Sequence, residues 1–222
     1  MRLPRLLPAI LSAAVLALLP AAPAAAQYAD RPTPGVVRVR LETAAGGIVL
    51  ALDARHAPVT TANFMRYVDD GRFDGISFYR AARNRRAPQF GFIQSGIRTD
   101  ARRFLDTIAH EPTSRTGIRH LDMTISMARR GAPGSANGNW FITIGAMPTM
   151  DARPGNPGYA AFGRVVAGQD VVRRILARPT GGGMGGTLLM QPVYVRRAVR
   201  LDGVARPTGR PRPWLIERRR DG

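Results

Sequence analysis

Between residues 36 and 201 the chain is dominated by short segments in which apolar and polar residues alternate. Val37-Arg-Val-Arg-Leu41 alternates with period two, and residues 47–52 follow across a glycine-containing turn at 44–47. This spacing predicts a hairpin with one buried face. Further segments rich in β-branched and aromatic residues predict strands at 77–80, 92–95, 124–127, 140–144, 161–165 and 193–201.

Two other segments have helical spacing. The first opens at Ala57-Pro58, since proline in the first turn of a helix loses no hydrogen bond, and it closes at Gly71. The second covers residues 170–177, with Asp170 as its expected N-cap. Many short strands together with two helices predict a mainly β fold, a closed antiparallel barrel whose openings are covered by helices.

The two ends of the chain have a different composition. Residues 1–26 combine a basic start, a short apolar stretch and an Ala-x-Ala end, which predicts a signal peptide cut after Ala26. An uncleaved membrane anchor is the alternative, and the Ala-x-Ala end disfavours it. We expect a linker at 27–35, one folded domain at 36–202 and a basic, proline-containing disordered tail at 203–222.

Composition removes several classes of chemistry. The 222 residues include no cysteine, which excludes disulfides, thiol nucleophiles and cysteine-based metal sites. All 33 residues counted as lysine or arginine are arginine, so lysine bases and Schiff bases are excluded as well. The net charge of +18 would suit a nucleic acid, but the arginines are spread over the entire chain. We therefore expect no nucleic-acid partner.

Several motifs fail on their context. Residues 181–186 match the pattern G-x-G-x-x-G, but they follow Pro179-Thr180 and not a strand, so we interpret them as a flexible loop. The three histidines have no metal-ligand spacing and are predicted to be surface or turn residues: His56, His110 and His120. The G-x-S-x-G motif of serine hydrolases is absent from the sequence. These observations predict neither a metal site nor a cofactor site.

The remaining informative segments occur in a definite order along the chain: residues 43–53, 57–64, 67–71, 73–80, 92–94, 126–129, 139–142 and 158–165. This ordered series resembles the cyclophilin family of peptidyl-prolyl cis–trans isomerases, over about residues 36–202. The resemblance implies an eight-stranded closed antiparallel β-barrel with an α-helix at each end. It also implies a reaction that needs no cofactor.

By this resemblance, Arg80 of Phe78-Tyr-Arg80 is the catalytic residue, a cationic donor aimed at the proline nitrogen of the substrate. Phe141 matches the floor of the proline pocket, and Gln94 matches the side chain that supports the arginine. The alternative is that Arg80 is an ordinary surface arginine and Phe141 an ordinary core residue. The other substrate-binding residues implied are Phe90 or Phe92, Ala128, Arg129, Asn139, Met150 and Tyr159.

The chain departs from the family pattern in several places. The connection at 81–91 is longer and more basic than usual, which leaves open whether Phe90 or Phe92 lines the pocket. Asn139 stands where the family carries the longer glutamine. Thr149 stands where eukaryotic members carry a tryptophan that contacts cyclosporin, so we expect weak sensitivity to that drug.

These residues lead to two hypotheses. The first is a monomeric prolyl isomerase, periplasmic or secreted, that acts on proline-containing exported polypeptides with no cofactor and no transmembrane anchor after processing. The second is a binding module of the same fold, which holds proline segments with little or no turnover. Arg80 and Phe141 favour the enzyme, whereas Asn139 and the connection at 81–91 favour the module.

Overall fold

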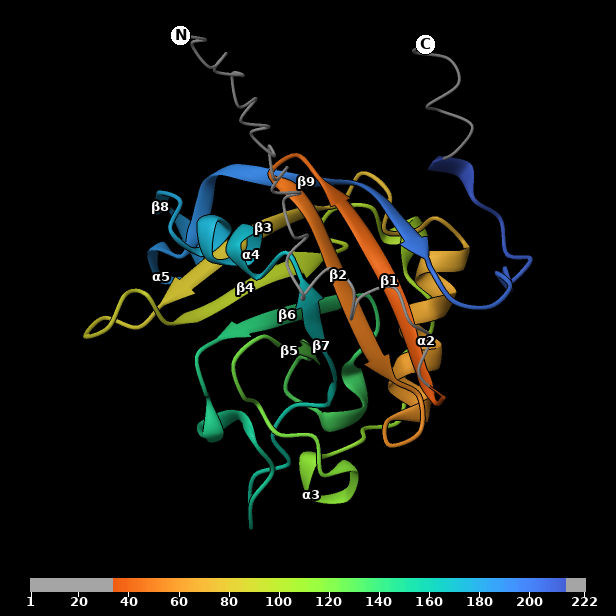
Figure 1. Cartoon of the computed structure of the whole chain (residues 1–222), viewed down its shortest axis with the longest axis horizontal. Coiled ribbons are helices and arrows are strands. Elements are labelled where there is room, and N and C mark those ends of the chain that lie inside the picture. The colour runs from red at the N-terminus through yellow and green to blue at the C-terminus, as the bar shows by residue number, and fades with distance from the viewer. Residues whose placement is uncertain (1–33, 215–222) are drawn as a thin grey trace, which may run out of the picture.

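The computed structural model describes residues 34–214, which form a β-barrel with short helices around it (Figure 1). The predicted signal peptide at 1–26, its cleavage site and most of the predicted linker lie outside the described residues. Within residues 34–214, no helix is both long enough and apolar enough to span a bilayer.

The described residues form nine strands, and all of their pairings are antiparallel. Their order is β1-β2-β7-β5-β6-β4-β3-β9-β8, and β1 also pairs with β9. This extra pairing closes eight strands into a barrel, while β8 adds a short hairpin to β9. The predicted closed antiparallel barrel is thus confirmed. The strands are β1 Val36–Thr43, β2 Gly46–Asp53, β3 Ser77–Arg83, β4 Gly91–Gly96, β5 Thr124–Met127, β6 Asn139–Ile144, β7 Ala161–Ala167, β8 Thr180–Gly181 and β9 Leu188–Arg200.

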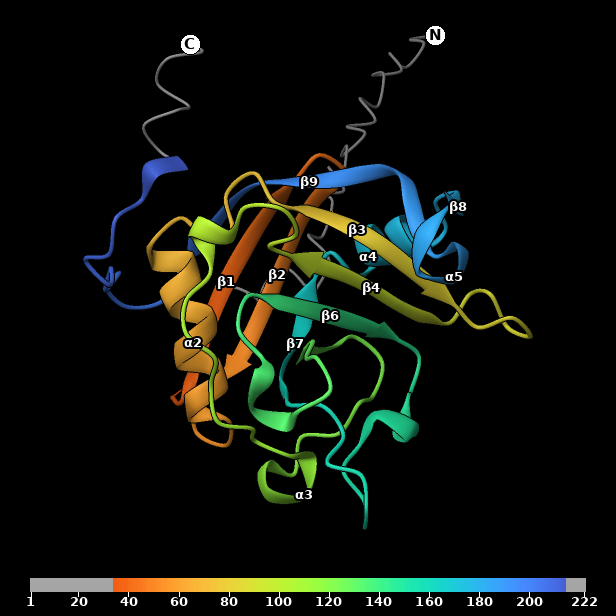
Figure 2. The ribbon, with the colours of Figure 1, turned by 180° about the vertical axis from the view of Figure 1, so that it is seen from behind.

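Two main helices flank the barrel on opposite sides, α2 (Pro58–Asp69) and α4 (Gln169–Leu176), both close to the predicted ranges (Figures 1 and 2). The connections carry shorter helical turns. These are α3 Thr113–Thr116, α5 Gly183–Gly186 and the 3₁₀ turns η1 Ala101–Arg103, η2 Pro133–Ser135 and η3 Pro148–Met150.

The interior of the barrel is filled by alternate residues of the strands, as the sequence pattern predicts. On β6, Trp140, Ile142 and Ile144 are buried in the core. Helix α2 covers one opening with Phe64, whose ring lies 5.7 Å from the ring of Trp140 and 5.5 Å from that of Phe162. Because side chains on a strand alternate between faces, Phe141 is left on the outside of the barrel wall.

Each main helix has one end whose free backbone groups form hydrogen bonds with a side chain far away in sequence. The backbone N–H groups of Val59 and Thr60, in the first turn of α2, donate to the buried carboxylate of Glu111. At the other helix, the Arg83 guanidinium donates to the carbonyls that end α4, including that of Arg178 at 3.1 Å. A carboxylate at a helix N-terminus and a cation at a C-terminus both match the helix dipole.

The structure differs from the sequence prediction at the C-terminal segment. Residues 203–214, expected to be disordered, lie against the end of α2, where the Thr208 hydroxyl donates to Asp70. The Trp214 side chain is 1% exposed, with the guanidinium of Arg72 over its ring at 4.7 Å. The segment thus docks through its own Trp214 ring, which packs against Arg72, and through Thr208, which donates to the buried carboxylate of Asp70. Residues 215–222 lie outside the described residues.

Candidate active site

A β-bulge at Tyr79 turns the predicted catalytic arginine away from the core. Phe78 pairs with Ser95 and Arg80 pairs with Gln94, so Tyr79 is an extra residue on β3. Phe78 and Ala81 belong to the core, and the two residues between them both lie on the outer side of the wall. Bulges redirect side chains in this way and are frequent beside active sites.

The Arg80 guanidinium is held by groups from three different segments. Its Nε donates to Thr187 Oγ1 at 2.9 Å, and its Nη1 donates to Gln94 Oε1 at 3.2 Å. The guanidinium carbon also lies 5.0 Å from the ring centroid of Phe92, a cation–π distance. Among residues 34–214, no group takes a hydrogen bond from Nη2. Arg80 is therefore fixed in orientation and still has donor capacity.

Phe141 lies beside this arginine with aromatic rings around it. The ring of Phe92 is 5.5 Å away and tilted, and the ring of Tyr159 is 5.5 Å away and perpendicular. The His120 ring is nearly parallel to it, at 6.0 Å between centroids. Phe141 is only 3% exposed, yet it does not belong to the barrel core. Phe141 therefore forms the floor of a separate aromatic patch outside the barrel.

A hollow of about 300 Å³ adjoins this patch and contains several of the predicted substrate-binding residues. The Ala128 N–H donates to the Asn139 carbonyl at 2.9 Å, which joins two sides of the hollow. The Tyr79 hydroxyl donates to Asn139 Oδ1 at 3.3 Å. Burial raises the pKa of Tyr79 to about 12, so it is neutral at physiological pH. The lining residues are Tyr79, Gln94, Ile97, Arg98, Phe104, Ala128, Arg129, Arg130, Ser135, Asn137, Asn139 and Met184.

The remaining predicted residues also gather near Phe141. The Tyr159 N–H donates to the Met150 carbonyl at 3.0 Å, which joins the segment around η3 to the segment before β7. The Arg129 guanidinium lies 5.0 Å from the Tyr159 ring centroid, and its Nε donates to the Gly158 carbonyl at 2.9 Å. Backbone carbonyls and an aromatic ring therefore hold this cation in place.

The structure favours Phe92 over Phe90 as the aromatic residue of the pocket. The Phe92 ring lies between Phe141 and the Arg80 guanidinium. Phe90 is 47% exposed, and its ring lies against Gly145, beyond the end of β6. The structure thus brings Arg80, Gln94, Phe92, Phe141, Asn139, Ala128, Arg129, Met150 and Tyr159 into one region and leaves Phe90 out of it.

Comparison with known proteins agrees with the resemblance to cyclophilins that the sequence motifs carry. The family profile "Cyclophilin type peptidyl-prolyl cis-trans isomerase/CLD" matches residues 38–198. The chain belongs to the cyclophilin family. It is 36% identical over 165 residues to the peptidyl-prolyl cis-trans isomerase cyp18 of Streptomyces antibioticus, covering 72% of this chain and 96% of that protein. It is also 36% identical over 137 residues to peptidyl-prolyl cis-trans isomerase A of Dickeya dadantii, covering 62% and 70%.

The fold comparison agrees. A crystal structure of a cyclophilin-type isomerase of Cryptosporidium parvum matches with a TM-score of 0.62 and 18% identity, covering 76% of this chain and 99% of that one. The chain is thus a cyclophilin-type peptidyl-prolyl cis–trans isomerase, with the eight-stranded barrel of that family.

Two residues of this cyclophilin site were not predicted from the sequence. Thr187, the acceptor for Arg80, follows the glycine-rich segment 181–186, for which the sequence predicts only a flexible loop. His120 was predicted to be a surface or turn residue, and this was wrong: it is 1% exposed and stacks on Phe141. Its burial depends on Asp151 and Ser126, whose side chains bind its two ring nitrogens. The sequence carries no signal that brings these three residues together.

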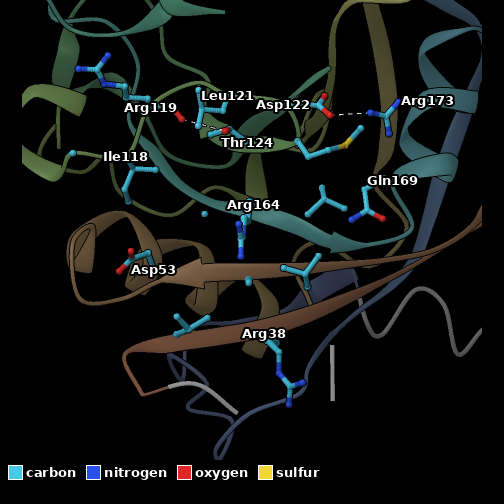
Figure 3. A pocket seen from close by; sticks show the side chains of 17 residues that line it. Arg38, Asp53, Ile118, Arg119, Leu121, Asp122, Thr124, Arg164, Gln169 and Arg173 are labelled. Carbon is cyan, nitrogen blue, oxygen red and sulfur yellow. Dashed lines mark hydrogen bonds and ion pairs between the residues drawn. The ribbon is translucent and has the colours of Figure 1, made fainter. Parts of the chain in front are cut away.

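A larger hollow of about 850 Å³ lies on another part of the cyclophilin barrel, bordered by β1, β2, β7 and α4 (Figure 3). Its ionic groups include Arg173 of α4, which pairs with Asp122, and Arg38, which pairs with Asp202 outside the lining. None of the predicted catalytic or substrate-binding residues lines it. Four of the predicted substrate-binding residues, Gln94, Ala128, Arg129 and Asn139, line the smaller hollow instead.

Proposed function

We propose that this cyclophilin isomerises X–Pro bonds in other exported polypeptides, and that Arg80 provides the catalytic donor. An X–Pro bond prefers the trans form only slightly, but the rotation barrier is close to 20 kcal/mol. Rotation breaks the amide resonance and localises a lone pair on the proline nitrogen. A cationic donor at that nitrogen stabilises the twisted state more than either planar state, and such differential stabilisation is what lowers the barrier.

The observation that carries this proposal is the bracing of Arg80 beside an aromatic floor. Thr187, Gln94 and Phe92 fix its guanidinium, so little reorganisation is needed when the substrate twists. Phe141, whose ring centroid lies 5.5 Å from that of Phe92, is the apolar ring next to which we place the substrate proline. The proline is then held while the carbonyl side of the peptide rotates.

Export rests on the sequence of residues 1–26, which lie outside the described residues. Their basic start, apolar stretch and Ala-x-Ala end support a signal peptide and a mature chain that begins at Gln27. N-terminal sequencing of the protein from the cell envelope tests this directly. A chain that retains Met1 in the membrane fraction would contradict cleavage.

The activity is tested with a protease-coupled assay of proline isomerisation. The Arg80→Ala variant should lower kcat/KM by about 10²-fold or more, as for loss of other preorganised donors, while peptide affinity falls much less. Arg80→Lys should also be poor, because a point charge cannot reproduce the guanidinium fork that Gln94 and Thr187 brace. The matched control is Arg85→Ala, an exposed arginine in the β3–β4 connection, which should leave kcat/KM unchanged.

Two results would count against the proposal. An equal loss of affinity and rate in Arg80→Ala would mean that the arginine only holds the peptide. Peptide binding by the wild-type chain without measurable turnover would mean that it acts as a proline-binding module.

A further inference from the structure

His120 lies next to Phe141, the aromatic floor of the site, and neither the sequence nor the proposed reaction gives it a role there. Its ring is buried and nearly parallel to that of Phe141, with 9° between the planes and 6.0 Å between the centroids. Phe92 and Tyr159 contact the same Phe141 ring in tilted and perpendicular arrangements. His120 is therefore one of the rings that determine where Phe141 sits.

Both nitrogens of the His120 ring have a specific partner. Nδ1 lies 2.7 Å from Asp151 Oδ1, and Nε2 lies 2.9 Å from the Ser126 hydroxyl oxygen. An ionised carboxylate can only accept, so the proton of the neutral ring belongs on Nδ1 and Nε2 accepts from Ser126. The His120 backbone N–H donates to the same Asp151 oxygen at 3.0 Å, which fixes the carboxylate as well. The neutral imidazole is thus fully satisfied in this environment.

The order Asp151, His120, Ser126 matches that of a catalytic triad, but access rules out the same role. Ser126 lies on β5, where it pairs with Phe141 of β6, and Ser126 is 0% exposed. A substrate carbonyl therefore cannot reach its hydroxyl, and a nucleophile must touch the atom it attacks. Through the His120 ring, these hydrogen-bonded residues instead contact Phe141.

We propose that His120 is a positioning residue of the proline pocket, which acts by holding the Phe141 ring in place through its hydrogen bonds to Asp151 and Ser126. This inference rests on the part of the proposed function that makes Phe141 the pocket floor. Protonation of the ring would turn Nε2 from an acceptor into a donor and would force the Ser126 hydroxyl to turn away. The pocket should therefore weaken when His120 becomes charged.

The surroundings of the His120 ring predict that it becomes protonated only at acidic pH. Burial lowers the pKa of His120, and the hydrogen bond and charge of Asp151 oppose that effect. The neighbours on β5 and β6, Ser126 and Phe141, are uncharged, and on its own segment Arg119 and Asp122 have exposed side chains. The ring is thus neutral at pH 7, and its protonation belongs below the ordinary histidine value of about 6.5.

The test measures the affinity of an Ala-Ala-Pro-Phe peptide between pH 5 and 8, with KM and kcat in parallel. Wild-type affinity should fall with decreasing pH along the titration of His120, while kcat changes less. NMR signals of the imidazoles report that titration, and three histidines make assignment simple. Because affinity does not require turnover, this measurement stays informative even if Arg80 is not catalytic.

Variants separate positioning from a general effect of acid. His120→Gln keeps polar contacts but has no ring and does not titrate, so its affinity should be about 3- to 10-fold weaker at pH 7.5, the worth of an aromatic contact, and independent of pH. His120→Phe keeps the flat ring and should recover part of the affinity, again without pH dependence. The controls His56→Gln and His110→Gln should retain the wild-type profile.

Two outcomes would overturn the proposal. One is a wild-type affinity that stays constant while the NMR signals show His120 titrating, which needs no variant and so does not depend on their folding. The other is a His120→Gln protein with wild-type affinity and a wild-type pH profile.

Discussion

The Arg80 Nε–H donates to Thr187 Oγ1 over 2.9 Å, although 107 residues separate the two in sequence. The Thr187 hydroxyl in turn donates to the Met184 carbonyl at 2.7 Å, within the glycine-rich turn 181–186. The Thr187 carbonyl also accepts from the backbone N–H of Ala81. The glycine-rich segment therefore positions an acceptor for Arg80, the proposed catalytic residue, and this gives the segment a role beyond connecting β8 to β9.

Thr187→Val tests this role, because it keeps the shape of the side chain and removes the acceptor for Arg80. We expect kcat to fall about 3- to 10-fold, consistent with loss of one hydrogen bond to a charged group, with little change in KM. Thr187→Ser retains the hydroxyl and should restore most of the rate. The protease-coupled assay measures these rates. An unchanged kcat in Thr187→Val would show that Gln94 and Phe92 position Arg80 for turnover without Thr187.

The outer position of Arg80 could not be predicted from alternation alone. In a regular strand Phe78 and Arg80 are two residues apart and share a face, so burial of Phe78 would bury Arg80 as well. The bulge at Tyr79 breaks this relation, and neither glycine nor proline marks it in the sequence. Only the resemblance to cyclophilins pointed to Arg80, and the structure supplies the physical reason.

Other parts of the fold were predictable because their signals are local. The hairpin of β1 and β2 and the core residues of β6 follow from alternation over a few positions. The burial of His120 and the docking of Trp214 depend on partners more than 25 residues away, such as Asp151 and Arg72. Local patterns contain no information about such partners.

Removal of the pocket floor should affect binding and turnover together. Phe141→Ala removes the ring on which we propose that the substrate proline packs, and Phe92 and Tyr159 lose a ring contact each. We expect the peptide Kd and KM to rise about 10-fold or more, with kcat/KM falling at least as far. Phe141→Leu should be intermediate. A normal Kd for the peptide, measured by calorimetry in Phe141→Ala, would place the proline ring elsewhere.

The ion pair between Arg38 and Asp202 predicts a pH dependence of stability. The Arg38 side chain donates to both Asp202 oxygens, at 2.9 and 2.8 Å, and these hydrogen bonds hold the pKa of that carboxyl below its usual range. A folded-state pKa below the unfolded one means that the stabilisation is complete above about pH 4 and is lost as the pH falls further.

Asp202→Asn should therefore lower the free energy of unfolding by about 2 kcal/mol at pH 7, the worth of charge-assisted hydrogen bonds. Its difference from the wild type should shrink as the pH falls below the unfolded-state value toward the lowered folded-state pKa, because Asp202 then becomes protonated in the folded protein as well. Denaturant titrations at several pH values measure this. Asp170→Asn is the control, because the Asp170–Arg174 pair is exposed and should contribute little. A difference that stays constant from pH 7 to pH 2 would contradict the argument.

The C-terminal segment provides the last prediction, since the structure and the sequence pattern lead to opposite expectations. Asp70 is fully buried and accepts from the N–H and hydroxyl of Thr208, at 2.7 and 2.6 Å. Burial alone would raise the pKa of Asp70, but the bonds from Thr208 and Arg72 hold it below its usual range. The guanidinium groups of Arg72 and Arg103 both lie over the Trp214 ring, at 4.7 and 5.4 Å from its centroid.

Truncation after Gly203 should thus deprive Asp70 of both donors of Thr208 and remove the Trp214 ring that packs against Arg72. We expect Trp214→Ala to lower the free energy of unfolding by about 3 kcal/mol, as for a buried aromatic residue, and the truncation to lower it further. Thr208→Val should be destabilising mainly at neutral pH, because the ionised form of Asp70 is the one that needs these donors. Arg212→Ala, an exposed change in the same segment, serves as the control. Guanidinium denaturation curves that coincide for the full chain and the truncated one would show that the segment adds nothing and that the barrel holds Asp70 by itself.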